Sequence, residues 1–394
     1  MKKLSVVVYL FCLTQFVAGQ NAIDVKKQFT LAAQQYELLL KSHPDITKFP
    51  QSSNADGSPR DMASSWWCSG FFGGSLWYLY EYTKDPKWKD AAHKWSMAVE
   101  KEKNNTTTHD LGFMLYCPFG NGYRLTKNET YKDIMLTGAK SLATRFHPEY
   151  GVIKSWEKFA NYDYPVIIDN MMNLEFLFWA AKESGNKEFY NICLSHADST
   201  IKNHYRKDNS SYHVVCYDKG GKVLAKKTAQ GYADESAWGR GQSWGLYGYV
   251  VMYRETKNPV YLKEAENIAD FILNHPNLPK DKVPYWDYNA PNIPNEERDA
   301  SAAAIASSAL FELAEYSKKG DTYVKNAIEM LKSLSSPAYL APIGKNNNFI
   351  LMHSVGHKPQ HSEVDVPLVY ADYYYLEGLL RYNAWLQKKK GKKS

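Results

Sequence analysis

Apolar side chains recur at spacings of three and four residues along most of this 394-residue chain. That spacing is typical of helices that bury one face. Short polar turns separate many of these segments from one another. The segments that we expect to be helical are residues 24–43, 70–83, 86–103, 110–126, 129–146, 170–184, 187–206, 238–256, 259–274, 299–317, 321–335 and 366–387.

A short unit recurs among these segments: a helix ends, a polar turn follows, and an aromatic residue opens the next helix. The aromatic residues of five copies are Trp88, Tyr131, Tyr190, Tyr261 and Tyr323. Repeats of this kind indicate helical hairpins packed side by side. Twelve helices in alternating order therefore predict six hairpins with an inner and an outer ring, an all-α (α/α)6 toroid. One end of the inner ring would then form a cavity, walled by the longer loops.

The two ends of the chain are expected to lie outside this fold. Met1-Lys2-Lys3, the apolar run from Leu4 to Leu13 and the small residues before Gln20 form the pattern of a secretory signal peptide. The apolar run is too short to span a membrane. We expect residues 1–19 to be a signal peptide, residues 20–387 a single domain and residues 388–394 a basic tail. An exported, periplasmic protein is the corresponding prediction.

Composition narrows the class of ligand. The formal net charge is +6, but the predicted signal and tail hold seven lysines, and the rest of the chain carries a charge of −1. This balance argues against a nucleic-acid-binding surface. The cysteines after the signal form no CxxC pair, so zinc or thiol redox chemistry is not expected. The 11 Trp and 30 Tyr suit sugar binding, although a helical core could also use them as filler.

One stretch, Pro165–Glu175, joins an apolar strand-like run to a helix through Asp169. A carboxyl group at such a junction can be partly desolvated and rigidly held, and both conditions let it donate a proton near neutral pH. The alternative is a structural helix cap. Asp110 stands at the head of another predicted helix, beside His109. If both helices belong to the inner ring, the two acids face the same end, as acid–base chemistry on sugars requires.

A glycine-rich segment holds further candidates. Arg240 and Trp244 are four residues apart and would share one helix face. There the guanidinium could bind a carboxylate while the indole stacks on a sugar ring. His213 lies upstream, and a lone histidine is more often structural than functional.

Four motifs occur in order along the chain. They are Trp67-Cys68-Ser69-Gly70-Phe71, His109-Asp110-Leu111-Gly112-Phe113, Asp169-Asn170-Met171-Met172-Asn173 and Trp238-Gly239-Arg240-Gly241-Gln242-Ser243-Trp244. Together they resemble the unsaturated glucuronyl hydrolases of glycoside hydrolase family 88, from about residue 25 to 387. The unsaturated rhamnogalacturonyl hydrolases of family 105, which act on pectin fragments, are the related alternative.

This resemblance implies a hydrolase that removes a 4,5-unsaturated uronic acid from lyase-generated oligosaccharides by hydrating the C4=C5 bond. Chondroitin- or hyaluronan-type disaccharides are the first expectation and heparin-type ones the second. Asp169 would donate the proton and activate the water, and Asp110 would hold substrate hydroxyls and keep Asp169 protonated. No metal or cofactor is implied. The matching substrate-binding residues are Trp67, His109, His213, Gln230, Arg240 and Trp244.

The loop His353–His361 is the last candidate. In the family that it resembles, the corresponding loop meets the second sugar, where Ser354, His357 and Lys358 could bind a sulfate. An ordinary polar loop is the alternative. Two rival functions on the same fold are a non-catalytic sugar-binding protein and a sugar epimerase. The paired acids argue against the first, and the second should show two histidines facing each other across the cavity.

Overall fold

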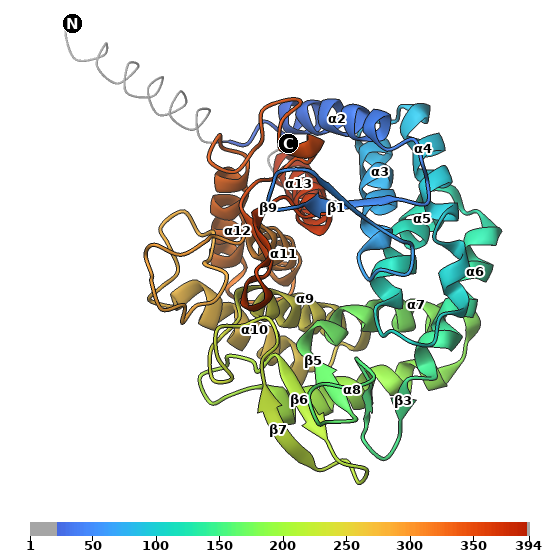
Figure 1. Ribbon diagram of the computed structural model, residues 1–394, viewed down its shortest axis with the longest axis vertical. Helices are drawn as coiled ribbons and strands as arrows, with labels where there is room; N and C mark the ends of the chain where they lie inside the picture. The colour runs from blue at the N-terminus through green and yellow to red at the C-terminus, as the bar shows by residue number, and fades with distance from the viewer. Residues whose placement is uncertain (1–21, 392–394) are drawn as a thin grey trace, which may run out of the picture.

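The computed structural model describes residues 22–391, so the predicted signal peptide lies outside the described residues. Within them, twelve α-helices form two concentric rings (Figure 1). The inner elements are α3 (Ser69–Thr83), η2 with α5 (Gly112–Gly120 and Asn121–Thr126), η3 with α7 (Ile168–Asn173 and Leu174–Ser184), α9 (Gly239–Thr256), α11 (Ala300–Leu313) and α13 (Val369–Gly391). The outer helices are α2 (Val25–Ser42), α4 (Pro86–Met97), α6 (Glu129–Ala143), α8 (Lys187–His204), α10 (Pro259–Asn274) and α12 (Gly320–Leu334).

The inner ring is closed. Each inner element packs against the next along the chain, and α13 returns to pack against α3. The inner helix α11 is apolar nearly all round because it touches neighbours on every side, whereas an outer helix such as α12 buries one stripe at the spacing of three and four residues. The predicted (α/α)6 toroid is therefore confirmed.

Four turns from an inner to an outer helix share one design. A residue in the left-handed conformation ends the inner helix: Lys84, Lys127, Gly185 or Lys257. The next residue, Asp or Asn, caps the outer helix by accepting a backbone N–H. Trp88, Tyr131 and Tyr261 then turn inward in the first turn of the outer helix and are buried. This is the structural basis of the repeat seen in the sequence.

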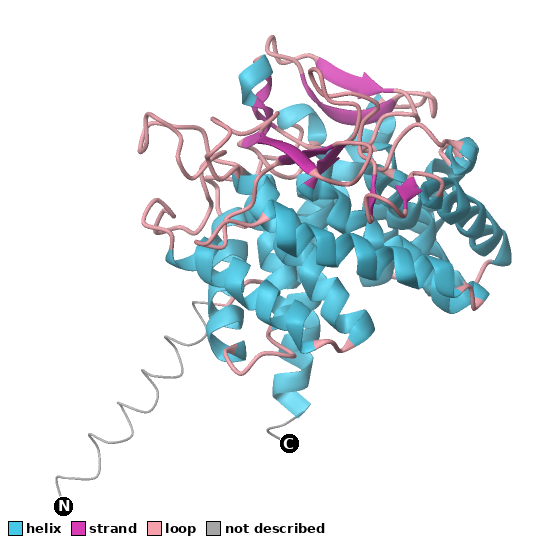
Figure 2. Ribbon diagram, turned by 90° about the horizontal axis from the view of Figure 1, so that it is seen from below, coloured by secondary structure: helices cyan, strands magenta, loops and turns pink. Residues whose placement is uncertain are grey.

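The longer connections run from outer to inner helices, and they carry the short strands that Figure 2 shows gathered at one end of the barrel. The strands are β1 (Phe49–Ser53), β2 (Pro59–Met62), β3 (Phe146–His147), β4 (Val152–Ile153), β5 (Pro165–Ile167), β6 (Val214–Tyr217), β7 (Val223–Lys227), β8 (Ser354–His357) and β9 (Ser362–Val366). They form three antiparallel hairpins, β1–β2, β3–β4 and β8–β9, and one three-stranded sheet in the order β5-β6-β7. The amino-terminal ends of the inner helices therefore lie at this strand end.

The structure differs from the expected helix boundaries in several places. The expected helix 86–103, for example, ends at Met97, and the 3₁₀ helix η1 (Glu100–Asn104) follows. Residues 110–126 contain the π-helix η2 before α5, with Pro118 inside it. Residues 168–173 form a 3₁₀ turn, η3, before the α-helix begins. Helix α13 continues to Gly391, so the lysines at the start of the expected tail extend the helix, and Lys388 Nζ lies 2.6 Å from Glu315. Among the described residues, no helix is long and apolar enough to cross a membrane.

Asp372, in the first turn of α13, fixes the loop that leads into β8. Its buried carboxyl group accepts the N–H groups of Ile350 and Leu351 at 2.9 Å each, and the Tyr36 hydroxyl at 3.4 Å. Burial raises the pKa of Asp372 to about 7.

We expect Asp372→Ala to destabilise the fold, because it leaves two buried N–H groups without an acceptor. Each unsatisfied group costs about 1–3 kcal/mol, so a loss of about 2–5 kcal/mol and a clear fall in Tm are expected. Thermal unfolding followed by circular dichroism measures this. The matched control is Asp133→Ala on an exposed position of α6, which should leave Tm unchanged. An equal Tm for both variants would contradict the anchoring role.

Candidate active site

Asp169 stands where the three-stranded sheet meets the inner ring. β5 ends at Ile167, the Ile168 N–H donates to the His213 carbonyl at 3.0 Å, and Asp169 follows as the second residue of η3. The residue is 9% exposed. Its side chain does not cap the helix, since η3 has no side-chain cap. The helix-cap interpretation is therefore wrong for this residue, and the predicted strand-to-helix junction is confirmed.

Asp169 holds its proton unusually tightly. Burial raises its pKa to about 7, and the negative charge of Asp110 raises it further, while Arg240 and the Trp244 indole N–H act in the opposite direction. The protonated carboxyl group therefore persists to much higher pH than that of an ordinary aspartate.

Asp110 lies just before η2 and belongs to the same site. Its Oδ2 accepts the Thr108 hydroxyl at 2.8 Å, and its Oδ1 lies 3.3 Å from His109 Nε2. Burial lowers the pKa of His109 although Asp110 opposes this. A neutral imidazole thus lies against a carboxylate that retains some exposure to solvent.

His213, immediately before β6, lies in a fixed tautomer. Its Nδ1 accepts the backbone N–H groups of Ala229 and Gln230, both at 3.1 Å. Burial lowers its pKa, and the positive charge of Arg240 lowers it further. A neutral ring that accepts at Nδ1 must carry its proton at Nε2. That Nε2 lies 3.7 Å from Asp169 Oδ2, so an N–H group faces the acid.

Arg240, in the first turn of α9, is buried between the rings of Trp238 and Tyr370, 4.6 and 5.3 Å from its guanidinium carbon. Nη1 contacts Asp299 Oδ2 at 3.3 Å and donates to the Val355 carbonyl.

Nη2 of Arg240 donates to the Gly356 carbonyl at 2.8 Å. Nε is buried without a partner. This N–H group is itself buried, so the structure gives the guanidinium a structural role and shows no exposed Arg240 N–H group for the predicted carboxylate contact.

Trp244 does not offer a stacking face. It is fully buried, and its ring packs against Phe113 and Tyr374, with centroids 5.2 and 5.5 Å away. The helical spacing correctly places Trp244 on the same side as Arg240, but an indole without exposed surface cannot stack on a sugar. Its buried N–H group has no hydrogen-bond partner in the structure but lies near enough to lower the pKa of Asp169. Trp67 is half-buried beside Tyr370 and Phe113 and retains an exposed part.

The β8–β9 hairpin approaches the acid site through backbone carbonyls. Gln230 Nε2 donates to the same Gly356 carbonyl as Arg240, at 2.9 Å. Ser354 is buried with an unpartnered hydroxyl, and His357 is half-buried with its pKa lowered by burial and by Arg240. The hairpin therefore brings two of the predicted sulfate-loop residues toward the site.

Lys358 is differently placed. Its Nζ lies 2.6 Å from Glu296, contacts Glu297 and sits over the Trp286 ring. Two carboxylates thus neutralise the cation that was expected to bind a sulfate.

Three residues of the site were not predicted as functional. Asp299 and Tyr370 hold Arg240, and Asn173 accepts the Gly112 N–H at 2.9 Å through its side chain, which links the η2 and η3 elements that carry the two acids. Asp299 caps α11, and the sequence pattern of a helix cap gives no indication that the same side chain also contacts Arg240. Asn173 belongs to the Asp169–Asn173 motif, so of the three residues it alone could have been singled out from the sequence.

The arrangement can perform proton transfer. A buried carboxyl group with a pKa near 7, a neutral imidazole N–H, a second carboxylate and a buried guanidinium converge at the strand end of the ring. Among the described residues there is no cluster of three or more His, Cys, Asp or Glu side chains that could hold a metal ion. An acid that titrates near neutral pH can donate a proton and then act as the base.

Comparisons with known proteins agree with this chemistry. The model for Glycosyl Hydrolase Family 88 matches residues 45–252. An unsaturated glucuronyl hydrolase of Formosa agariphila is 45% identical over 91% of this chain and 90% of its own. An unsaturated chondroitin disaccharide hydrolase of Streptococcus agalactiae is 32% identical over 86% of this chain and 87% of its own.

Solved structures give the same result. A crystal structure of an unsaturated glucuronyl hydrolase specific for heparin is 46% identical, with a TM-score of 0.90, over 92% of this chain and 98% of that one. The unsaturated glucuronyl hydrolase of Bacillus sp. GL1 is 28% identical, with a TM-score of 0.85, over 91% and 96%. This chain belongs to Glycosyl Hydrolase Family 88.

Proposed function

We propose that this chain is an unsaturated glucuronyl hydrolase that removes the 4,5-unsaturated uronic acid from lyase-generated glycosaminoglycan disaccharides. The observation that carries the proposal is Asp169, a buried acid with a pKa of about 7 beside a second carboxylate. Protonation of a vinyl ether needs an acid of this kind. The relatives, all glycoside hydrolases of this type by name, support the same reaction. The signal-like pattern of residues 1–19 supports action after export.

In the proposed reaction Asp169 first donates a proton and then takes one back. Its carboxyl group gives a proton to C4, and the C4=C5 electron pair forms the new C–H bond. The cation left at C5 is stabilised by the ring oxygen. Water then bonds to C5 while the Asp169 carboxylate takes its proton. The hemiketal opens by breaking the C5–O5 bond, C1 becomes a hemiacetal, and its collapse releases the neighbouring sugar.

The surrounding residues have distinct parts in this proposal. The His213 Nε2–H group faces Asp169 from 3.7 Å and can donate to the carboxylate or to the incoming water. Asp110 accepts hydrogen bonds from substrate hydroxyls, and its charge keeps the proton on Asp169. The positive charge of the buried Arg240 guanidinium attracts the uronate carboxylate.

Heparin-type disaccharides are our first choice of substrate, which reverses the order expected from the sequence. Identity to the heparin-specific enzyme is 46%, against 32% for the chondroitin hydrolase of S. agalactiae. The pectin-fragment alternative gains no support from the family assignment.

We expect the chain to consume unsaturated heparin-type disaccharides faster than chondroitin or hyaluronan ones. The assay follows the ultraviolet absorbance of the C4=C5 bond, which disappears on hydration. Asp169→Asn should abolish turnover while leaving Tm and the circular dichroism spectrum unchanged, because an amide cannot donate this proton. Persistent absorbance with every disaccharide would refute the proposed activity. A faster reaction on chondroitin disaccharides would refute only the ranking.

The pH profile tests the assignment of the acid. Since Asp169 must be protonated, kcat/KM should fall as pH rises through about 7. Asp110→Asn removes a like charge, lowers the pKa of Asp169 and should move this limb to lower pH. Trp244→Phe removes an N–H group that favours the carboxylate and should move the limb to higher pH. Identical limbs in all three proteins would contradict the assignment.

Variants of Lys358 and of its partner Glu297 should change the preference for sulfated disaccharides in opposite directions. Lys358→Ala exposes the charges of Glu296 and Glu297, so kcat/KM on sulfated disaccharides should fall more than on unsulfated ones. Glu297→Gln frees part of the lysine charge and should change the ratio in the opposite direction. Glu315→Gln is the control, because this exposed residue follows the carboxyl-terminal end of α11 and pairs with Lys388 instead of Lys358. A sulfated-to-unsulfated ratio that is equal in all variants would exclude this loop from sulfate selection.

A further inference from the structure

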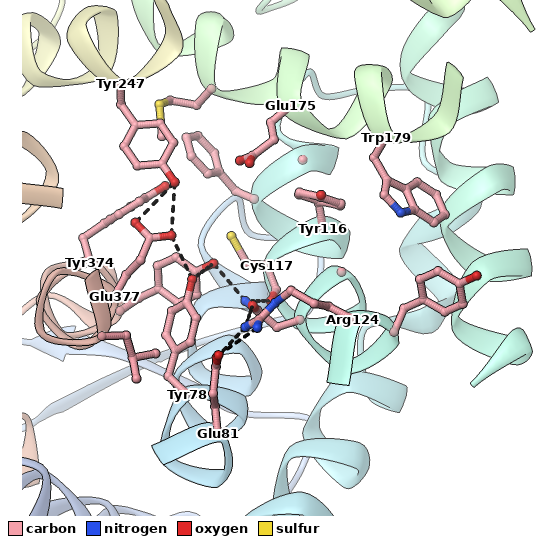
Figure 3. Close-up of a pocket in the computed structure, with 18 of the residues that line it drawn as sticks. Tyr78, Glu81, Tyr116, Cys117, Arg124, Glu175, Trp179, Tyr247, Tyr374 and Glu377 are labelled. Atoms are coloured by element: carbon pink, nitrogen blue, oxygen red, sulfur yellow. Dashed lines mark hydrogen bonds and ion pairs between the residues drawn. The ribbon is translucent and has the colours of Figure 1, made fainter. Parts of the chain in front are cut away.

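A cavity of about 540 Å³ reaches toward the end of the inner ring opposite to the strands, and Figure 3 shows residues that line it. We call it the far cavity. Its walls run from the carboxyl-terminal parts of inner elements, with Glu81 on α3, Arg124 on α5 and Glu183 on α7, to Gly112 and Met172 near the amino-terminal ends of η2 and α7. The acids Asp110 and Asp169 precede these last two residues, so the acid site lies beyond the inner end of the far cavity.

The two sites are separated by side chains. Phe113 and Met172 line the far cavity, and Phe113 also packs 5.2 Å from Trp244 and 5.5 Å from Trp67 on the other side. Neither Asp110 nor Asp169 is among the described residues that line the far cavity. A ligand there would not touch the reacting groups.

One wall of the far cavity is aromatic. Trp179 is half-buried, with its ring 5.9 Å from Tyr123 in a perpendicular contact and 6.1 Å from Tyr116. Figure 3 shows Trp179 and Tyr116 on the side away from Tyr247 and Tyr374. Aromatic rings at a hollow with polar neighbours match the C–H faces and hydroxyl edges of a sugar ring.

The lining of the far cavity also contains hydrogen-bonding groups in fixed positions. The Glu377 carboxylate accepts the hydroxyls of Tyr78 at 2.9 Å and of Tyr247 at 3.1 Å. Arg124 forms a two-pronged ion pair with Glu81, and its Nη2 also donates to Asn121 Oδ1 at 3.0 Å. Donors and acceptors are therefore both present and held by one another, which lowers the entropy lost when a ligand binds.

The charges select the class of ligand. Four carboxylates, Glu81, Glu175, Glu183 and Glu377, and three cations, Arg124, Lys127 and Arg381, line the far cavity. The carboxyl ends of the inner helices add partial negative charge. A free anion, including the unsaturated uronate, meets the carboxylates, and a free cation meets the arginines and the lysine. A neutral polyhydroxyl ligand avoids both penalties, and its hydroxyls can donate and accept hydrogen bonds alongside these existing pairs.

We propose that the far cavity binds a neutral saccharide. This sugar site is separate from the acid site. The proposal does not depend on whether the acid site acts on unsaturated uronates. Such a site would keep the enzyme close to neutral glycan while the strand end remains free for substrate.

Saturation-transfer NMR tests the proposal with the mature chain and three neutral probes: lactose, cellobiose and N,N′-diacetylchitobiose. At least one probe should give a saturable signal with wild type and with Asp169→Asn. Trp179→Ala should weaken that binding by about tenfold or more, because it removes an aromatic platform. The kcat/KM on the unsaturated disaccharide should stay within about twofold, since Trp179 lies outside the acid site. Tyr116→Phe, which removes one hydroxyl at almost constant volume, should also weaken binding. This second variant keeps the test available if Trp179→Ala does not fold.

Matched controls decide between the sites. Trp66→Ala removes a 37% exposed tryptophan at the other end of the ring and should leave the neutral-sugar signal intact. An unsaturated disaccharide bound to Asp169→Asn should not displace the neutral sugar. Absence of a signal with all three sugars, displacement by the unsaturated disaccharide, or a signal unaffected by both cavity variants would each overturn the proposal. Binding of choline or sulfate instead of the sugars would overturn the ligand class.

Discussion

One buried cation connects the parts of the molecule that must be held together for chemistry. Arg240 begins α9, contacts Asp299 at the start of α11, packs on Tyr370 of α13 and donates to two carbonyls of β8. A buried guanidinium is tolerated only when its charge and its N–H groups are paired. The hairpin over the site is therefore held by the same group whose charge opposes burial in setting the pKa of Asp169. Positioning of the hairpin and tuning of the acid cannot be separated at this residue.

Much of the fold could be predicted from the sequence because its information is local. The apolar spacing and the repeated turn, such as that at Lys84 and Asp85, each depend on residues of one helical hairpin. The order of the hairpins along the chain then defines the two rings. The π-helix Gly112–Gly120 could not be predicted, since it differs from an α-helix by the register of its backbone hydrogen bonds alone. The short strands also depend on partners: β5 pairs with β6, about fifty residues away in the sequence.

The site was predictable where position along one helix decides the outcome and unpredictable where packing does. Asp169 and Asp110 were found because each heads an inner element. The role given to Trp244 failed because helical spacing places a side chain on a face but says nothing of what covers it. Lys358 looked like a free cation because its partners, Glu296 and Glu297, are some sixty residues away along the chain.

The direction of the inner helices explains why the acid lies where it does. All amino-terminal ends meet at the strand end, where helix dipoles favour anions and should lower the pKa of a carboxyl group. Asp169 nevertheless has a raised pKa because burial outweighs the opposing charge of Arg240. The same positive field remains available to an incoming uronate, which arrives already charged. The ring can thus attract an anionic substrate and keep its own acid protonated, provided that this acid is more deeply buried than the ligand. The three-stranded sheet enforces this by placing Asp169 directly after β5.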